Sequence, residues 1–297
     1  RLKRGCMLPI IKSRRHARFI AGVAICGAAL TTLNVEANDH TLDQRTSDAL
    51  DAAIAGAHRS DRNKARDRYR RPKETLAFFG LRTDMTVVEL SPGGGWYTEV
   101  LAPVVRDGGK LYAAHYDMNA GNWQRRSLGG FLQKLAETPD VYDQVVVTAI
   151  PEAGGAPMAP LESADLVLTF RNVHNWLTPG SGGEAGAIAT FADMYRVLKP
   201  GGVMGVVDHR WPDPATEDPD AGNGYLSEDR EIRLAGAAGF EFVARSDHNA
   251  NPKDTHDHPN GVWTLPPDLD ADEADKEKYL SIGESDRMVL KFRKPAN

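Results

Sequence analysis

Cysteine is almost absent from this 297-residue chain, and its two cysteines, Cys6 and Cys26, both lie near the N-terminus. The sequence beyond residue 37 therefore contains no thiol. This excludes disulfides, Cys-ligated zinc and thiol catalysis from that part, and it is compatible with an oxidising compartment.

An excess of positive charge is also lacking outside the N-terminal segment. Residues 1–37 hold 7 of the 36 Lys and Arg residues and 1 of the 41 Asp and Glu residues, which leaves 29 basic and 40 acidic residues in 38–297, a formal net charge of −11. Such an acidic chain would repel phosphate backbones, so we expect no nucleic-acid partner. A small-molecule substrate is the simpler expectation.

A long apolar run is missing as well, because the N-terminal one covers only residues 19–33. It follows a basic segment, residues 12–18, and it is followed by a small-x-small pattern at residues 35–37. This order is typical of a cleaved signal peptide, and the run is short for a membrane span. We therefore expect residues 1–37 to be a signal peptide and the mature protein to be periplasmic or secreted, without a stable membrane anchor. A retained N-terminal anchor is the alternative.

Short apolar segments alternate with helical patterns from residue 81 onward. The expected strands are residues 86–90, 110–115, 144–149, 165–170, 203–208, 240–245 and 287–293. Strands that alternate with helices indicate βαβ units and a doubly wound, Rossmann-like α/β sheet. We expect this domain to span residues 72–297. Residues 38–71 are expected to form a helical segment before it, which Pro72 ends, with the basic run 59–71 as a solvated helix face.

A glycine-rich turn, residues 91–95, follows the first expected strand and precedes a helix. Such a turn lets the backbone approach a ligand closely, while the next helix offers free N–H groups. Glu89, at the end of the strand, is placed to accept hydrogen bonds from a ribose or an amino group.

The sequence at this turn resembles a known family. Val88-Glu-Leu-Ser-Pro-Gly-Gly-Gly-Trp-Tyr-Thr98 is similar to motif I of class I S-adenosylmethionine-dependent methyltransferases, and Tyr195-Arg-Val-Leu-Lys-Pro-Gly-Gly202 resembles the segment before their fifth strand. Residues 165–176 are similar to their fourth strand and its loop, and residues 283–293 to their antiparallel last strand. More narrowly, the chain resembles secreted bacterial predicted methyltransferases. The resemblance covers residues 72–294 and implies a seven-stranded, mostly parallel sheet.

The resemblance implies S-adenosylmethionine as cofactor and methyl transfer as reaction. The residues that it places at the cofactor are Glu89, Ser91, Gly93, Gly95, Asp117, Arg171 and Asn172. Ser91 stands where the family has its first glycine. His115 occupies the usual place of the acid that holds the ribose, and Asp117 follows it by two residues. After the third strand the available acid is Glu152.

Three histidines, His115, His174 and His209, each follow an expected strand. The carboxyl ends of parallel strands carry the ligand crevice in open α/β sheets, and a histidine there can remove a proton from an acceptor. His174 is the first candidate for this base. His209 is the second, with Asp208 orienting it or contacting the substrate. The alternative is that each histidine only bonds loop backbone.

Two further interpretations stay open. One is a different use of the same fold, in which the crevice of an exported protein binds another small ligand or a metal; a dinucleotide-dependent redox enzyme is a weaker variant of it. The other is a divalent metal bound by the histidines and aspartates at residues 248–258 of the loop 246–275, where no regular frame presets them as ligands. We therefore assign no metal ligand and expect this loop to be a solvated lid over the substrate pocket.

Overall fold

The computed structural model describes residues 42–151 and 155–296. The expected signal peptide and Glu152 lie outside these ranges. The described residues belong to one compact unit, residues 38–297, so the helices before residue 72 pack with the sheet domain. No helix within the described ranges is both long and apolar enough to cross a membrane.

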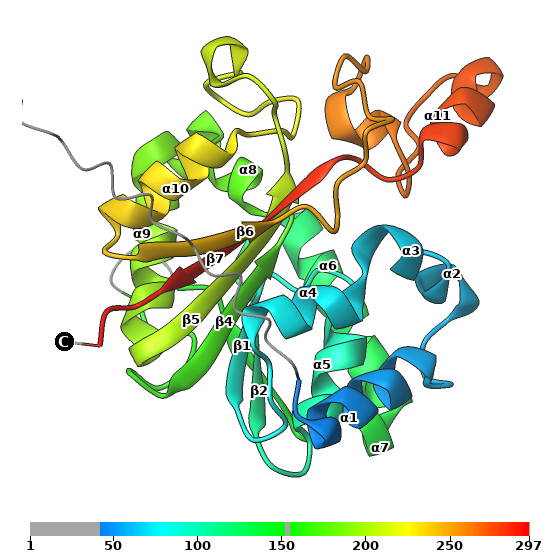
Figure 1. Ribbon diagram of the computed structural model, residues 1–297. Helices are drawn as coiled ribbons and strands as arrows, with labels where there is room; N and C mark the ends of the chain where they lie inside the picture. The colour runs from blue at the N-terminus through cyan, green and yellow to red at the C-terminus, as the bar shows by residue number, and fades with distance from the viewer. Residues whose placement is uncertain (1–41, 152–154, 297) are drawn as a thin grey trace, which may run out of the picture. The chain divides into compact units, whose positions relative to one another are not determined.

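Seven strands form one sheet in the order β3-β2-β1-β4-β5-β7-β6 (Figure 1). Their bounds are β1 Thr86–Leu90, β2 Lys110–His115, β3 Val145–Ala149, β4 Ala164–Phe170, β5 Leu198–His209, β6 Glu241–Ser246 and β7 Arg287–Arg293. Strands β1 to β5 are parallel, and β7 is antiparallel to both β5 and β6. The expected Rossmann-like α/β fold with an antiparallel last strand is confirmed. The order reverses between β1 and β4, where such sheets place their ligand crevice.

Helices cover both faces of this sheet (Figure 1). Those on one side are α1 Gln44–Ala55, α4 Pro72–Phe79, α5 Thr98–Val105, α6 Asn122–Glu137 and α7 Pro139–Tyr142. Those on the other side are α8 Val173–Trp176, α9 Gly183–Val197 and α10 Glu228–Ala237. Two short helices, α2 Asp61–Lys64 and α3 Asp67–Arg70, connect α1 to α4, and α11 Lys276–Ile282 precedes β7. Each face has its own cluster of buried apolar side chains.

Pro72 begins a helix, which corrects the expectation that it only ends one. It occupies the first turn of α4, where a missing N–H costs nothing and the fixed φ suits the helix. Gly80 ends α4 in the left-handed conformation with φ +81°. Between them α4 presents Phe79 to the sheet, and a side chain at Gly205 of β5 would lie 2.6 Å from the Phe79 ring. Because Gly205 has no side chain, α4 can pack directly on β5.

The expected turn at residues 199–202 lies inside β5. Pairing with β4 passes from Ala164 opposite Leu198 to Leu166 opposite Val203, so the intervening residues form an irregularity in the strand. Gly201 accommodates it with φ +79°. From Val203 on, β5 is regular and reaches the carboxyl edge of the sheet at His209.

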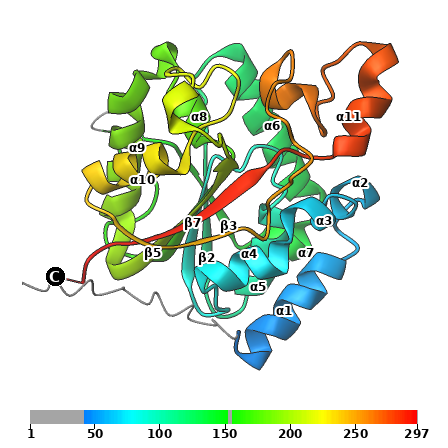
Figure 2. The same cartoon turned by 45° about the horizontal axis from the view of Figure 1, so that its top comes forward.

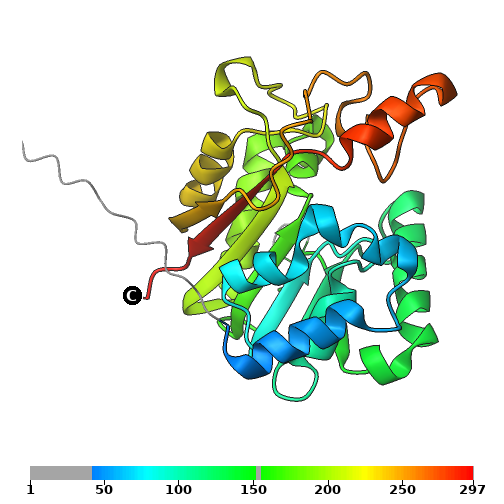
Figure 3. The same ribbon diagram turned by 45° about the vertical axis from the view of Figure 1, so that its right-hand side comes forward.

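The chain segments between β5 and β7 gather at that same edge. Figures 2 and 3 show the loop after β5 and the segment from β6 to α11 at the end of the sheet that also carries α8. Helix α3 reaches this end too, because Tyr69 lies against Gly283 before β7. Elements that are distant in the sequence thus enclose the carboxyl ends of β1, β4 and β5.

Candidate functional site

The loop after β1 is an open elbow. Ser91, Gly93 and Gly95 all have positive φ, at 56°, 58° and 76°. A side chain added at Gly93 or Gly94 would meet no atom within 4 Å, whereas one at Gly95 would lie 3.0 Å from the Phe131 ring. The elbow is therefore closed on the helix side at Gly95 and open at residues 93–94.

Trp96 does not fill this opening. Its indole N–H donates to the backbone oxygen of Asn63 at 3.1 Å, and its ring lies under the guanidinium groups of Arg59 and Arg70. The indole is thereby held against the N-terminal helices.

Glu89 is a buried carboxylate beside the elbow. Its Oε2 accepts a hydrogen bond of 2.6 Å from the hydroxyl of Thr98, at the start of α5. Burial raises the pKa of Glu89 to about 7, and the Thr98 hydrogen bond and Lys134 act in the opposite direction. A cationic group bound next to Glu89 would favour the ionised carboxylate.

Two cavities meet at the elbow. The smaller, about 220 Å³, is lined by Glu89, Gly93 and Gly94 together with residues of α2, α3 and the end of β4. The larger, about 480 Å³, lies beyond β2 between Asp117 and Trp123 and the residues after β3 and β4. The two cavities share two lining residues, Ser91 and Asn172. A ligand with two unlike ends could therefore span them.

Asn172 ties the ends of β1 and β4 together. Its amide nitrogen donates to the backbone oxygen of Leu90 at 3.3 Å and to the hydroxyl of Thr169 at 3.0 Å. Arg171, just before it, has φ +63°, and burial lowers the pKa of its guanidinium to about 10. Within residues 42–151 and 155–296, that guanidinium has neither a hydrogen bond nor an ion pair.

His115 supports the elbow from below. Its Nδ1 accepts the backbone N–H of Tyr116 at 2.7 Å, so Nε2 carries the proton and donates to the backbone oxygen of Gly93 at 3.1 Å. Burial also lowers the pKa of His115. Both nitrogens are used by backbone, which is the alternative that the sequence left open for each histidine. Asp117 lies on the wall of the larger cavity, where its carboxylate accepts the N–H of Asn119.

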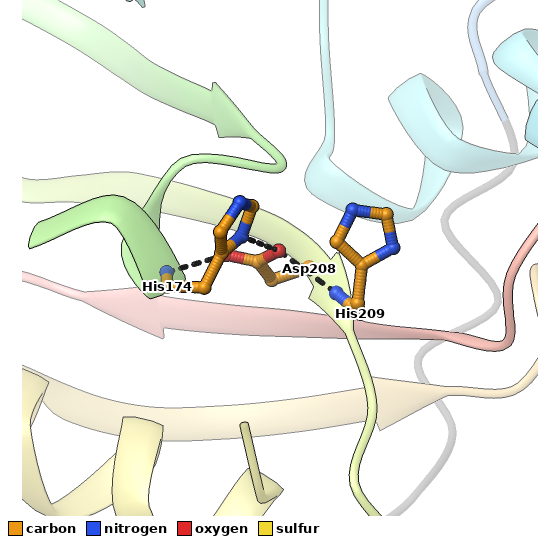
Figure 4. Close-up of side chains that lie close together, drawn as sticks. All are labelled: His174, Asp208 and His209. Carbon is orange, nitrogen blue, oxygen red and sulfur yellow. Dashed lines mark hydrogen bonds and ion pairs between the residues drawn. The ribbon is translucent and has the colours of Figure 1, made fainter. Parts of the chain in front are cut away.

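His174, Asp208 and His209 lie together at the ends of β4 and β5 (Figure 4). The Asp208 carboxylate accepts a hydrogen bond from Nδ1 of His174 at 2.9 Å and another from the backbone N–H of His174 at 3.2 Å. Asp208 was expected to orient the His209 ring, but it accepts only the backbone N–H of His209, at 2.8 Å. The His209 ring instead pairs through Nδ1 with Ser285. The dyad is therefore His174 with Asp208.

The two rings have different electrostatic surroundings. Burial is the main cause that lowers the pKa of His209 well below its usual range, and the charges of His174, Arg287, Arg171 and Arg70 add to it. His209 is thus neutral at pH 7. Among the described residues, neither Nε2 has a hydrogen-bond partner, and His174 and His209 are only 4% and 3% exposed.

The arginines near this site were not found by sequence analysis. Arg59 and Arg70 are only 2% and 5% exposed, so the expectation of a solvated helix face at 59–71 is wrong for these two residues, whereas Arg62, Arg68 and Arg71 are exposed. Arg59 pairs with Asp67 and Glu99, and Arg70 pairs with Glu284. Their partners lie as far as 214 residues away, and no local pattern could have indicated that.

The loop 246–275 is packed in part, around Asp254 and residues 261–265, and is otherwise largely exposed. Asp254 is buried and accepts hydrogen bonds from the Tyr225 hydroxyl, from the backbone N–H of Asp286 and at 2.8 Å from His258. Asp254 and His258 are thus used internally, whereas Asp247, Asp257 and Asp268 are exposed. Among the described residues, His174, Asp208 and His209 are of the types that can bind a metal ion. One ligand atom of each lies within 4.8 Å of the other two.

Comparison with known proteins gives the fold. No family model matches the chain, and no curated protein matches it. A SAM-dependent methyltransferase from Aquifex aeolicus shares 17% identity with a TM-score of 0.51, covering 77% of this chain and 92% of that one. A putative sarcosine dimethylglycine methyltransferase from Galdieria sulphuraria shares 14% at 0.51, covering 80% and 87%. The [4+2]-cyclase SpnF shares 16% at 0.54, covering 85% and 94%.

These neighbours place the chain in the Rossmann-like methyltransferase fold. At such low identity they show the fold alone, and the cyclase among them illustrates that one fold carries more than one chemistry. The chemistry of this protein therefore has to be inferred from the cavities and their side chains.

Proposed function

We propose that this protein binds S-adenosylmethionine across the two cavities and transfers its methyl group to a small-molecule acceptor. The observation that carries the proposal is the junction of the cavities at Ser91 and Asn172, beside the open backbone at residues 93–94. The cofactor has an amino-acid end and a nucleoside end. The smaller cavity suits the first and the larger cavity the second.

The side chains of the two cavities fit the chemistry of those ends. Glu89 would receive the α-ammonium group, and the open backbone at Gly93 and Gly94 would receive the α-carboxylate. In the larger cavity Asp117 would hold the ribose hydroxyls, with Trp123 beside the base. When bound, the cofactor supplies a methyl group on a sulfonium, which is a good leaving group.

His174 is the proposed base. Asn172 and Asn175, on either side of it in the chain, line the larger cavity. Asp208 holds the Nδ1–H of the ring, so the lone pair of Nε2 is free to take the proton that an acceptor hydroxyl or amine loses. As that proton leaves, the acceptor's electron pair would bond to the methyl carbon, while the carbon–sulfur bond breaks and its electron pair stays on sulfur. Asp208 then stabilises the imidazolium.

The acidic charge of residues 38–297 supports a small acceptor rather than a nucleic acid. The pattern of residues 1–37 supports export, and we propose that the enzyme acts in the periplasm or outside the cell. The methyl acceptor would then also be a molecule of that compartment.

Isothermal titration of the full chain with S-adenosylmethionine and with S-adenosylhomocysteine tests the function. We expect one site with micromolar dissociation constants for both ligands, because both share the nucleoside and amino-acid ends. Binding weaker than millimolar for both would overturn the proposal.

A further inference from the structure

Four arginines surround a single buried carboxylate next to the proposed active site. Glu284 accepts hydrogen bonds from Arg66, from Arg70 at 3.1 Å and from Arg287. The carboxylate is 1% exposed. The fourth arginine, Arg171, has no ion pair among residues 42–151 and 155–296, although its charge contributes to lowering the pKa of Glu284.

This cluster has more donors than acceptors. The Nη2 atoms of Arg66 and Arg70 and the Nε of Arg287 are buried without a hydrogen-bond partner in the described residues. A buried charged donor is costly to leave unpaired. Arg66, Arg70 and Arg171 line the cavity of about 220 Å³, and Arg70, Arg171 and Arg287 line a recess of about 10 Å³ behind it. The recess has room for roughly one water-sized atom, so a larger group must bind in the cavity.

A charge count shows what the cavity lacks. Four guanidinium groups and one carboxylate leave three positive charges, and ionised Glu89 reduces this to two. S-adenosylmethionine does not neutralise them, because its sulfonium, ammonium and carboxylate groups sum to one positive charge. These charges favour a further anion in the cavity, with Asp268 the other carboxylate that acts on Arg171.

The arginines also face the two histidines. Arg70, Arg171 and Arg287 all act on His209, which lies 5.2 Å from His174 between ring centres. This positive surrounding opposes a divalent cation at His174, Asp208 and His209, since like charges repel strongly in a buried site. It favours an anion near the same residues.

We propose that the methyl acceptor carries a carboxylate or phosphate group, which Arg171 binds together with Arg70 and Arg66. This inference rests on the proposed function and names the class of its substrate. The anionic group anchors the acceptor in the arginine cavity, and the nucleophile then lies toward Nε2 of His174. Arg171 is the specific determinant, because it has no hydrogen-bond or ion-pair partner among the described residues and would gain one from the ligand.

The test uses inorganic phosphate and malonate as probes, titrated at constant ionic strength into the full chain with and without saturating S-adenosylhomocysteine. We expect millimolar or tighter binding in both states, weakened at least tenfold in Arg171→Gln. Arg293→Gln is the matched control, because it removes the same charge from an exposed pair with Glu241. It should leave binding unchanged. Arg171→Lys, which keeps the charge, should retain part of the affinity and guards against a folding defect in the first variant.

The outcomes separate the two proposals. Binding of the probes that disappears once S-adenosylhomocysteine is present would overturn the inference, because the arginines would then serve the cofactor's own carboxylate. Equal binding by the wild type and Arg171→Gln would overturn it too. If S-adenosylhomocysteine fails to bind while the probes bind in an Arg171-dependent way, the proposed function fails and the anion site stands.

Discussion

The Nδ1 of His174 lies 2.9 Å from Oδ1 of Asp208, and the backbone N–H of His174 donates to the other oxygen of the same carboxylate. One carboxylate thus fixes both the main chain and the ring of His174. Because an ionised carboxylate only accepts hydrogen bonds, the proton must sit on Nδ1 and the lone pair on Nε2. The structure thereby sets the tautomer that a general base needs.

This arrangement predicts the behaviour of Asp208→Asn. The His174 ring should lose its preference for the Nδ1–H tautomer, and the protein should lose about 1–3 kcal/mol of unfolding free energy, because a buried acceptor of three hydrogen bonds is weakened. Nitrogen-15 NMR of the imidazoles reads the tautomer, and denaturant unfolding reads the stability. Asp272→Asn, on the surface, should change neither. An Nε2–H tautomer in the wild type would refute the assignment of His174 as base.

Glu89 predicts a pH dependence of cofactor binding. Its pKa of about 7 means that the carboxylate loses charge as pH falls from 8 to 6. The affinity for the cationic S-adenosylmethionine should therefore fall in that window, by at most tenfold per pH unit. Glu89→Gln should bind weakly and without this dependence. Thr98→Val removes a hydrogen bond that lowers the pKa, so its profile should move to higher pH. A flat wild-type profile between pH 6 and 8 would count against Glu89.

Gly94 allows binding to be separated from folding. A side chain there meets no protein atom within 4 Å, and no positive φ is required. Gly94→Ala should therefore leave the melting temperature nearly unchanged, yet weaken S-adenosylhomocysteine binding at least tenfold by filling the elbow. Gly236→Ala, an equally open position on α10, should leave binding unchanged and can only raise the melting temperature, because alanine is the better helix former. Unaltered affinity in Gly94→Ala would show that the ligand does not approach the elbow.

Glu231 predicts how stability varies with pH. Burial, and then the charge of Asp208, raises the pKa of Glu231 well above its ordinary value, and both its oxygens lack partners among the described residues. Its stability contribution is complete below the unfolded pKa of about 4.3 and is lost as pH rises toward the folded pKa, by at most about 1.4 kcal/mol per unit. The free energy of unfolding of Glu231→Gln should thus increase relative to that of the wild type as pH rises from 5 to 8. Glu277→Gln, an exposed control, should not. Parallel pH profiles for Glu231→Gln and the wild type would contradict this.

Much of the fold could be predicted from the sequence because its signals are local. Strands β1, β2 and β7 begin and end where the apolar runs do, since each run is bounded by polar or glycine-rich turns. Helix α4 was missed because Pro72 was interpreted only as a helix breaker, although proline is equally suited to the first turn.

The candidate site was less accessible to sequence reasoning. The elbow, Glu89 and His174 follow from motif and strand-end position. The pairing of Asp208 with His174 does not, because adjacency in the chain suggested His209 instead. The arginine cluster depends on contacts between α3, β4 and β7, so it becomes visible only once the chain is folded.

A crystal structure of the full chain with S-adenosylhomocysteine tests the central proposal most directly. We expect density for the amino-acid end beside Glu89, for the sulfur near Ser91 and Asn172, and for the adenosine beside Asp117 and Trp123. Density in another place, or none at saturating concentration, would contradict the assignment of the two cavities to one cofactor.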